Sequence, residues 1–101
     1  MTPEALARLA QSGIQLVAEI KEYAIFARGN CMAMAKLTAS GPAGVGSTGL
    51  VTDRGLAYLV ERGGQAFLSG KAGEVPASAQ EVEALRTFSQ DLIAGLDLPA
   101  L

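Results

Sequence analysis

Hydrophobic residues recur at helical spacing near both ends of the chain and alternate with a strand-like period between them. The C-terminal pattern is the most regular, with apolar residues at helical spacing from Val82 to Leu96. Ser78 and Glu81 precede it in the S-x-x-E arrangement of a capping box, which satisfies two free backbone donors at a helix start. The pattern therefore predicts a helix from about Ser78 to Gly95.

The first residues predict a shorter helix. Thr2 suits the N-cap position and Pro3 the first helical position. Two alternatives follow. Either the helix ends at Gly13 and residues 14–20 alternate as a strand, or it continues to about Lys21 with its apolar residues on one face. The break at Gly13 is the alternative that we favour.

A β-hairpin is predicted between Tyr23 and Leu37, because Gly29-Asn30 divides two apolar stretches at the spacing of a two-residue turn. Residues that lie opposite each other across such a hairpin share one face of the sheet. The opposed pairs are Arg28 with Cys31, Phe26 with Ala33, and Ile25 with Met34.

Both faces of this hairpin are largely apolar. One face carries Tyr23, Ile25, Ala27, Met32 and Met34. The other carries Ala24, Phe26, Cys31, Ala33, Ala35 and Leu37. A hairpin with one solvated face would alternate apolar and polar residues, so we expect both faces to be covered.

The middle of the chain predicts two loops and three more strands. The segment 39–49 is rich in Gly, Ser and Ala, and we interpret it, like 70–77, as a loop. Turn residues separate the strands. The strands are predicted at 50–52, 56–61 and 65–69, and the turns at 53–55 and 62–64.

This order predicts an α+β fold, in which an N-terminal and a C-terminal helix flank an antiparallel sheet of five to six strands. We expect a single domain over residues 1–101, with a short tail at 97–101. The helices can cover one face of the sheet, and the other apolar face needs a partner. We therefore expect a homodimer, although a different protein could cover the same face. The predicted interface residues are Tyr23, Ile25, Met32 and Met34.

Composition narrows the class of protein. The 101 residues are 50% hydrophobic and 18% charged with a net charge of −2, which argues against intrinsic disorder. The chain has no run of Lys or Arg to form a basic face for nucleic acid, and no apolar run of the ~20 residues that span a bilayer. Together with the single cysteine and the absence of a signal-peptide pattern, this predicts a cytoplasmic protein of bacterial type.

The residue types that are missing also restrict the chemistry. The chain has no histidine and one cysteine, so it cannot build a Ser-His-Asp or Cys-His pair, and a zinc site lacks its usual ligands. We find no carboxylates at metal-ligand spacing. The sequence therefore predicts no metal and no cofactor, and favours a protein that is not an enzyme.

The segment from Gly41 to Thr48 resembles a Walker A phosphate loop, G-x-x-x-x-G-K-[ST]. Ser47 stands where that family has its lysine, and a strand rather than a helix is predicted to follow. We therefore expect a connection between strands. Its backbone amides could still bind a small anion. The candidate residues are Gly41, Gly44, Gly46, Ser47 and Thr48.

Cys31 is the one catalytic candidate, with Arg28 opposite it in the predicted hairpin. A nearby cation favours the thiolate, which would suit a redox or nucleophilic residue. The chain supplies no histidine as a base and no second cysteine to resolve an oxidised form. A buried free cysteine commonly serves as a small apolar residue.

No motif in the chain identifies a family, and three hypotheses remain. The first is a non-enzymatic, homodimeric interaction or assembly module that uses the second apolar face. The second is a small-ligand or anion-binding domain that uses the Gly-rich segment 41–49. The third is a thiol or redox protein based on Cys31.

Overall fold

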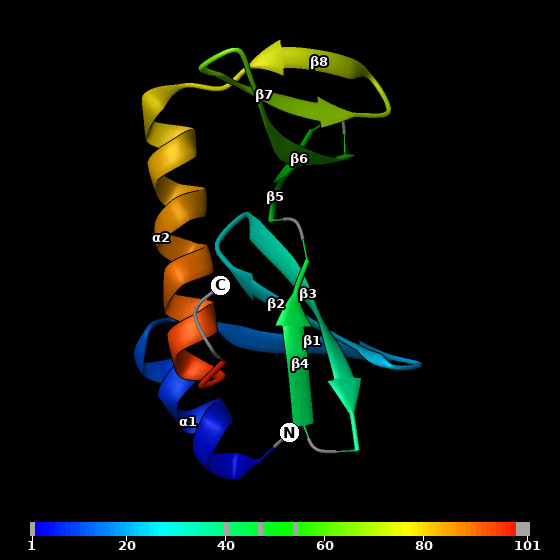
Figure 1. Ribbon diagram of the computed structural model, residues 1–101, viewed down its shortest axis with the longest axis vertical. Coiled ribbons are helices and arrows are strands. Elements are labelled where there is room, and N and C mark those ends of the chain that lie inside the picture. The colour runs from blue at the N-terminus through cyan, green and yellow to red at the C-terminus, as the bar shows by residue number, and fades with distance from the viewer. Residues whose placement is uncertain (1, 40, 47, 54, 99–101) are drawn as a thin grey trace.

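The computed structural model describes residues 2–39, 41–46, 48–53 and 55–98. A helix, an antiparallel sheet of eight strands and a second helix follow one another along the chain (Figure 1). The helices are α1 (Pro3–Gln11) and α2 (Ala79–Gly95). The strands are β1 (Gln15–Ile20), β2 (Tyr23–Arg28), β3 (Cys31–Thr38), β4 (Gly41–Val45), β5 (Gly49–Thr52), β6 (Gly55–Arg62), β7 (Gln65–Gly70) and β8 (Gly73–Pro76). The predicted α+β class is confirmed.

Helix α1 begins and ends where the favoured alternative places it. Thr2 caps it, with its Oγ1 accepting a hydrogen bond from the Ala5 N–H at 3.2 Å. Gly13 then adopts φ 77°, and the Ile14 N–H turns back to the Leu9 carbonyl at 2.9 Å. The alternative of one longer helix is therefore wrong. Helix α2 carries the predicted capping box, with both reciprocal hydrogen bonds present.

The β2–β3 hairpin has the predicted register. Its turn places Gly29 at φ 60°, which glycine adopts without steric penalty. The three predicted pairs, which include Arg28 with Cys31 and Ile25 with Met34, are opposite each other. Successive side chains of a strand point to opposite faces, so Phe26 lies on one side of the sheet and Ile25 on the other.

Two strands lie in the segments that the sequence predicts as loops. Strand β4 pairs with the C-terminal half of β3, and β8 pairs with β7. Both are edge strands of the sheet, which runs in the order β1-β2-β3-β5-β6-β7-β8 with β4 beside β3. Glycine and proline are tolerated at sheet edges, where fewer ladder hydrogen bonds are needed. The loop assignments for these residues are therefore wrong, and the sheet has eight strands rather than five to six.

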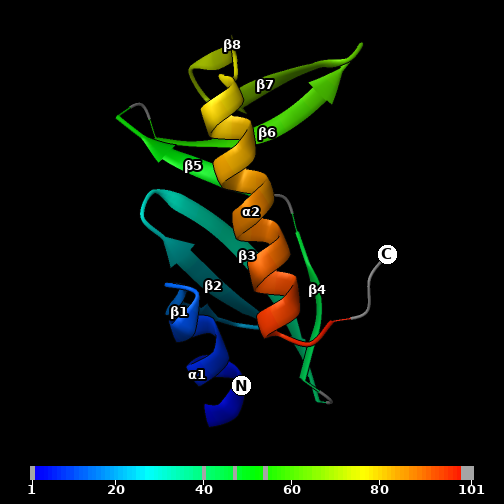
Figure 2. The ribbon, with the colours of Figure 1, turned by 90° about the vertical axis from the view of Figure 1, so that its left-hand side faces the viewer.

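Both helices pack on the same face of the sheet, which we call the inner face (Figures 1 and 2). Helix α2 crosses the strands, and α1 packs beside its C-terminal end. The core lies between these layers. It contains Leu9, Ile14, Ala24, Phe26, Cys31, Ala33, Ala35, Leu50, Leu68, Leu85, Phe88, Leu92 and Leu96.

The two helices approach each other closely at Gly95. A Cβ placed there would lie 2.4 Å from Leu9 Cδ2, so glycine makes this contact possible. Arg8 adds a hydrogen bond from its Nε to the Gly95 carbonyl at 3.1 Å. Because both helices lie on the inner face, the opposite face of the sheet, which we call the outer face, carries no described helix (Figure 1).

Candidate functional site

The predicted interface residues lie together on the outer face. Tyr23, Ile25, Met32 and Met34 all point away from the helices, because each is out of phase with a buried neighbour in its strand. Tyr23 remains 36% exposed and Met34 40% exposed, whereas Ala24 and Phe26 on the inner face are fully buried.

The apolar outer face continues onto β5 and β6. Met32 pairs with Gly49, which pairs with Tyr58, so these positions share the outer face. Val51 and Leu56 form the next outer pair. Sequence reasoning missed Leu56 and Tyr58. The alternation of side chains along β6, counted from the predicted turn at 53–55, could have placed them on this face.

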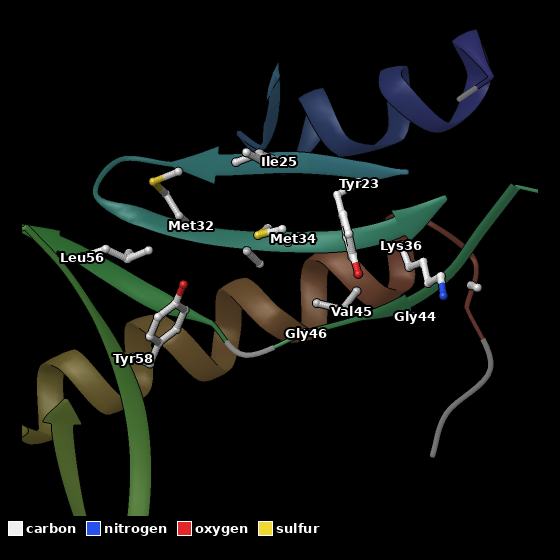
Figure 3. Close-up of a pocket in the computed structure, with 12 residues that line it drawn as sticks. Tyr23, Ile25, Met32, Met34, Lys36, Gly44, Val45, Gly46, Leu56 and Tyr58 are labelled. Carbon is white, nitrogen blue, oxygen red and sulfur yellow. The ribbon is translucent and has the colours of Figure 1, made fainter. Parts of the chain in front are cut away.

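Outer-face residues of β2, β3 and β6, together with residues of β4, line a groove of about 640 Å³ (Figure 3). Strand β3 lies along it, with β6 on one side and β4 on the other. The described residues that line the groove are Tyr23, Ile25, Met32, Ala33, Met34, Lys36, Ala43, Gly44, Val45, Gly46, Leu56 and Tyr58.

Gly49 explains part of the shape of this groove. A Cβ at this position would lie 2.8 Å from the Ala57 carbonyl oxygen and 3.1 Å from Leu56 Cδ1. A side chain on β5 would therefore compete with the β6 residues for the same space. Glycine leaves Leu56 and Tyr58 in place along one side of the groove.

The polar groups of the groove are few. Lys36 is the charged residue of its described lining and lies near Gly44 at the end marked by β4 (Figure 3). Among the described residues it forms no ion pair. The phenol rings of Tyr23 and Tyr58 line the same space. The groove is thus apolar along most of its length, with an amine at one end.

The Gly-rich segment adopts a different structure from a phosphate loop. Strand β4 takes up its first part, and β5 rather than a helix follows it. Gly44 and Gly46 line the groove, and the Gly46 N–H donates to the Met34 carbonyl at 2.8 Å. Successive groups of an extended strand point in alternate directions, unlike the converging amides of an anion nest.

Gly41 and Thr48 are not among the described residues that line the groove. Gly41 begins β4 with φ 111°, Thr48 precedes β5, and Ser47 lies outside the described residues. Anion binding by this segment stays a prediction.

Cys31 lies on the inner face, in the core. Burial raises the pKa of its thiol, and the Arg28 guanidinium opposes that shift only in part. These surroundings favour the protonated thiol, whereas a reactive cysteine needs the thiolate. The thiol or redox role of Cys31 stays a prediction without further support from its environment.

Arg28 connects three parts of the fold instead. Its Nη1 donates to Asp91 Oδ2 at 2.7 Å and to the Ser12 carbonyl at 3.0 Å. Its guanidinium also lies over the Phe88 ring, 5.6 Å from the centroid. The side chain therefore links β2 to the end of α1 and to α2.

In the part of the chain that the structure describes, no group of three or more His, Cys, Asp or Glu residues could hold a metal ion. No described helix is long and apolar enough to cross a membrane. Comparison of the chain with protein-family models, with curated proteins and with solved structures found no match. The function is therefore argued from the outer face and its groove.

Proposed function

We propose that this chain is an interaction module that works as a homodimer, with the outer face of its sheet packed against a second copy. The observation that carries the proposal is the row of large apolar side chains left without cover across β2, β3, β5 and β6. Its most exposed members are Tyr23, Met34, Val51, Leu56 and Tyr58, each with 36–44% of its surface exposed.

The composition of this face suits a dimer interface. The molecule measures 37 Å along its longest axis, along which the strands are stacked. A standard interface needs about 800 Å² from each partner, and tyrosine and methionine are enriched in such interfaces. Burial of apolar surface contributes about 25 cal/mol per Å² before the losses of association are subtracted. A contiguous apolar face of this kind is typical of a binding surface.

The charge distribution favours a second copy as the partner. A two-fold interface brings the same surface of both subunits together, so that surface must complement itself. Among the described residues that line the groove, Lys36 is the charged one. Arg62, farther along the outer face, is already paired with Glu74. An apolar face with few unpaired charges meets a copy of itself without strong repulsion.

Sedimentation at micromolar concentration tests this proposal. We expect a species of about twice 10.4 kDa. Met34→Glu should convert it to a monomer, because a carboxylate buried among the apolar side chains of the interface loses hydration that the exposed Lys36 nearby replaces only in part.

Val75→Glu is the matched control. Val75 is 51% exposed on the edge strand β8, where its pairing with Leu68 places it on the inner side of the sheet. The same charge there should leave the dimer intact. A wild-type chain that stays monomeric across the concentration range would refute the proposal, as would dissociation by both variants.

A further inference from the structure

The groove on the outer face has the form of a site for an elongated ligand. One end lies at Met32 and Leu56, and the other at Lys36 (Figure 3). Met32 and Lys36 lie on β3, which at a rise of ~3.3 Å per residue separates them by about 13 Å. The volume of about 640 Å³ lies within the range of small-molecule sites, roughly 300–1,000 Å³.

The chemistry changes along this length. Ile25 and Met34 offer apolar surface between the two ends, and the flexible thioether of Met34 adapts to irregular partners. At the far end, Lys36 supplies an amine that has no ion-pair partner among the described residues. Within the described residues, an apolar channel that ends at the Lys36 amine complements a molecule with an apolar body and a single negative head.

We propose that the groove binds a free alkyl monocarboxylate, with its chain along Met32, Met34 and Leu56 and its carboxylate at Lys36 Nζ. Burial of the chain provides most of the affinity, since each methylene removed from water contributes to binding. The ion pair at Lys36 is exposed and therefore contributes less, but it sets the preference for an anion and the direction of the chain.

A monocarboxylate fits better than a phosphorylated ligand. Sites for phosphate groups combine converging backbone amides with several donors or a helix N-terminus. Here the described lining supplies one lysine, and the nearby Gly46 N–H is already bonded to the Met34 carbonyl. One amine balances one negative charge.

This inference goes beyond the proposed dimer and does not depend on it. In a monomer the ligand would lie in an open groove. In a dimer it would lie at the interface and would change the dimer's dissociation constant. The two proposals therefore have separate readouts, ligand binding and mass.

The test is a titration of the full chain with decanoate below its micelle concentration, followed by NMR of methionine methyl groups labelled with ¹³C. We expect the signals of Met32 and Met34 to shift and saturate. Decanol, which has the same chain without the charge, should bind about two- to fivefold more weakly. Lys36→Met should weaken decanoate by a similar factor and remove the difference between the two compounds.

Lys71→Met is the matched control, because Lys71 is exposed in the turn between β7 and β8 and lies outside the groove lining. It should leave both affinities unchanged. Absence of saturable shifts at Met32 and Met34 would overturn the inference, and so would equal binding of decanoate and decanol.

Sedimentation of the same samples separates the two proposals. A dimer that gives no decanoate shifts retains the proposed function and overturns the ligand. A monomer that prefers decanoate over decanol, and loses that preference with Lys36→Met, retains the ligand and refutes the dimer.

Discussion

The two faces of the β2–β3 hairpin are both apolar, but the inner face combines Phe26 with several alanines, whereas larger side chains predominate on the outer face. The inner face carries Ala24, Ala33 and Ala35, each at most 3% exposed. The outer face carries Tyr23 and Met34, which remain 36% and 40% exposed. Hydrophobicity alone therefore does not decide which face receives the helices.

Small residues on the inner face allow a helix to approach the sheet closely. Helix α2 fills the space above these alanines with Leu85, Phe88 and Leu92, which are fully buried. Close packing of this kind provides dispersion contacts in addition to the removal of apolar surface from water. The large side chains of the outer face leave a groove instead, and Leu56 and Tyr58 pack over Gly49 along one side of it.

The largest expected effect contrasts one residue from each face. Phe26→Ala removes a fully buried ring from the inner face and should lower the free energy of unfolding by about 3–5 kcal/mol. Its neighbour Ile25 is only partly buried on the outer face, so Ile25→Ala should lower it by about 1 kcal/mol or less. Urea unfolding measures both free energies, at a protein concentration below the dissociation constant of the proposed dimer.

Phe26→Leu provides a milder inner-face variant if the alanine variant does not fold, and it should lose about 1 kcal/mol. Equal losses for Phe26→Ala and Ile25→Ala in dilute protein would show that the two faces are packed alike. That result would remove the distinction between them.

The hairpin and both helix boundaries are predictable from sequence because local chemistry determines them. Gly29-Asn30 provides a turn of defined length, and this length sets the register of every pair in β2 and β3. Thr2 and Ser78 cap their helices through contacts within three residues. The division into two apolar faces follows directly from that register.

The groove could not be predicted in the same way, because it depends on pairings between distant segments. Strand β3 pairs with β5 along its first part and with β4 along its last part, so two separate strands meet its one edge. Strand β4 has no polar–apolar alternation, and its Gly and Pro content resembles that of a loop. The sequence placed Met32 and Met34 on the face correctly but did not reveal that Gly44, Gly46 and Tyr58 would join them.

A second, smaller effect is expected from glycines at the groove. Gly49→Ala should lower the free energy of unfolding by about 1–3 kcal/mol, because the new Cβ would lie 2.8 Å from a backbone oxygen of β6. Gly44→Ala should be neutral or slightly stabilising, since nothing lies within 4 Å of its Cβ position. Thermal unfolding of the two variants measures the difference, and equal melting temperatures would contradict the close approach of β5 to β6.

The last comparison is between Cys31 and Met32, neighbours on β3 that face opposite sides of the sheet, and its expected effect on stability is the smallest. Cys31 lies in the core, where burial raises the pKa of its thiol. Met32→Cys in a Cys31→Ala background moves the thiol to the outer face. In protein diluted below the dissociation constant of the proposed dimer, iodoacetamide should label it at least about tenfold faster at neutral pH than it labels wild-type Cys31.

The raised pKa also predicts a sign for the pH dependence of stability. As the pH rises, the unfolded chain loses the thiol proton before the folded chain does. The contribution of Cys31 to the free energy of unfolding should therefore be constant below the unfolded pKa and should fall as the pH rises toward the folded value. Cys31→Ala should abolish this part of the decline. Fast labelling of wild-type Cys31, or a decline that is unchanged in Cys31→Ala, would show that the inner face admits solvent and that the two faces of β3 are less distinct than their packing indicates.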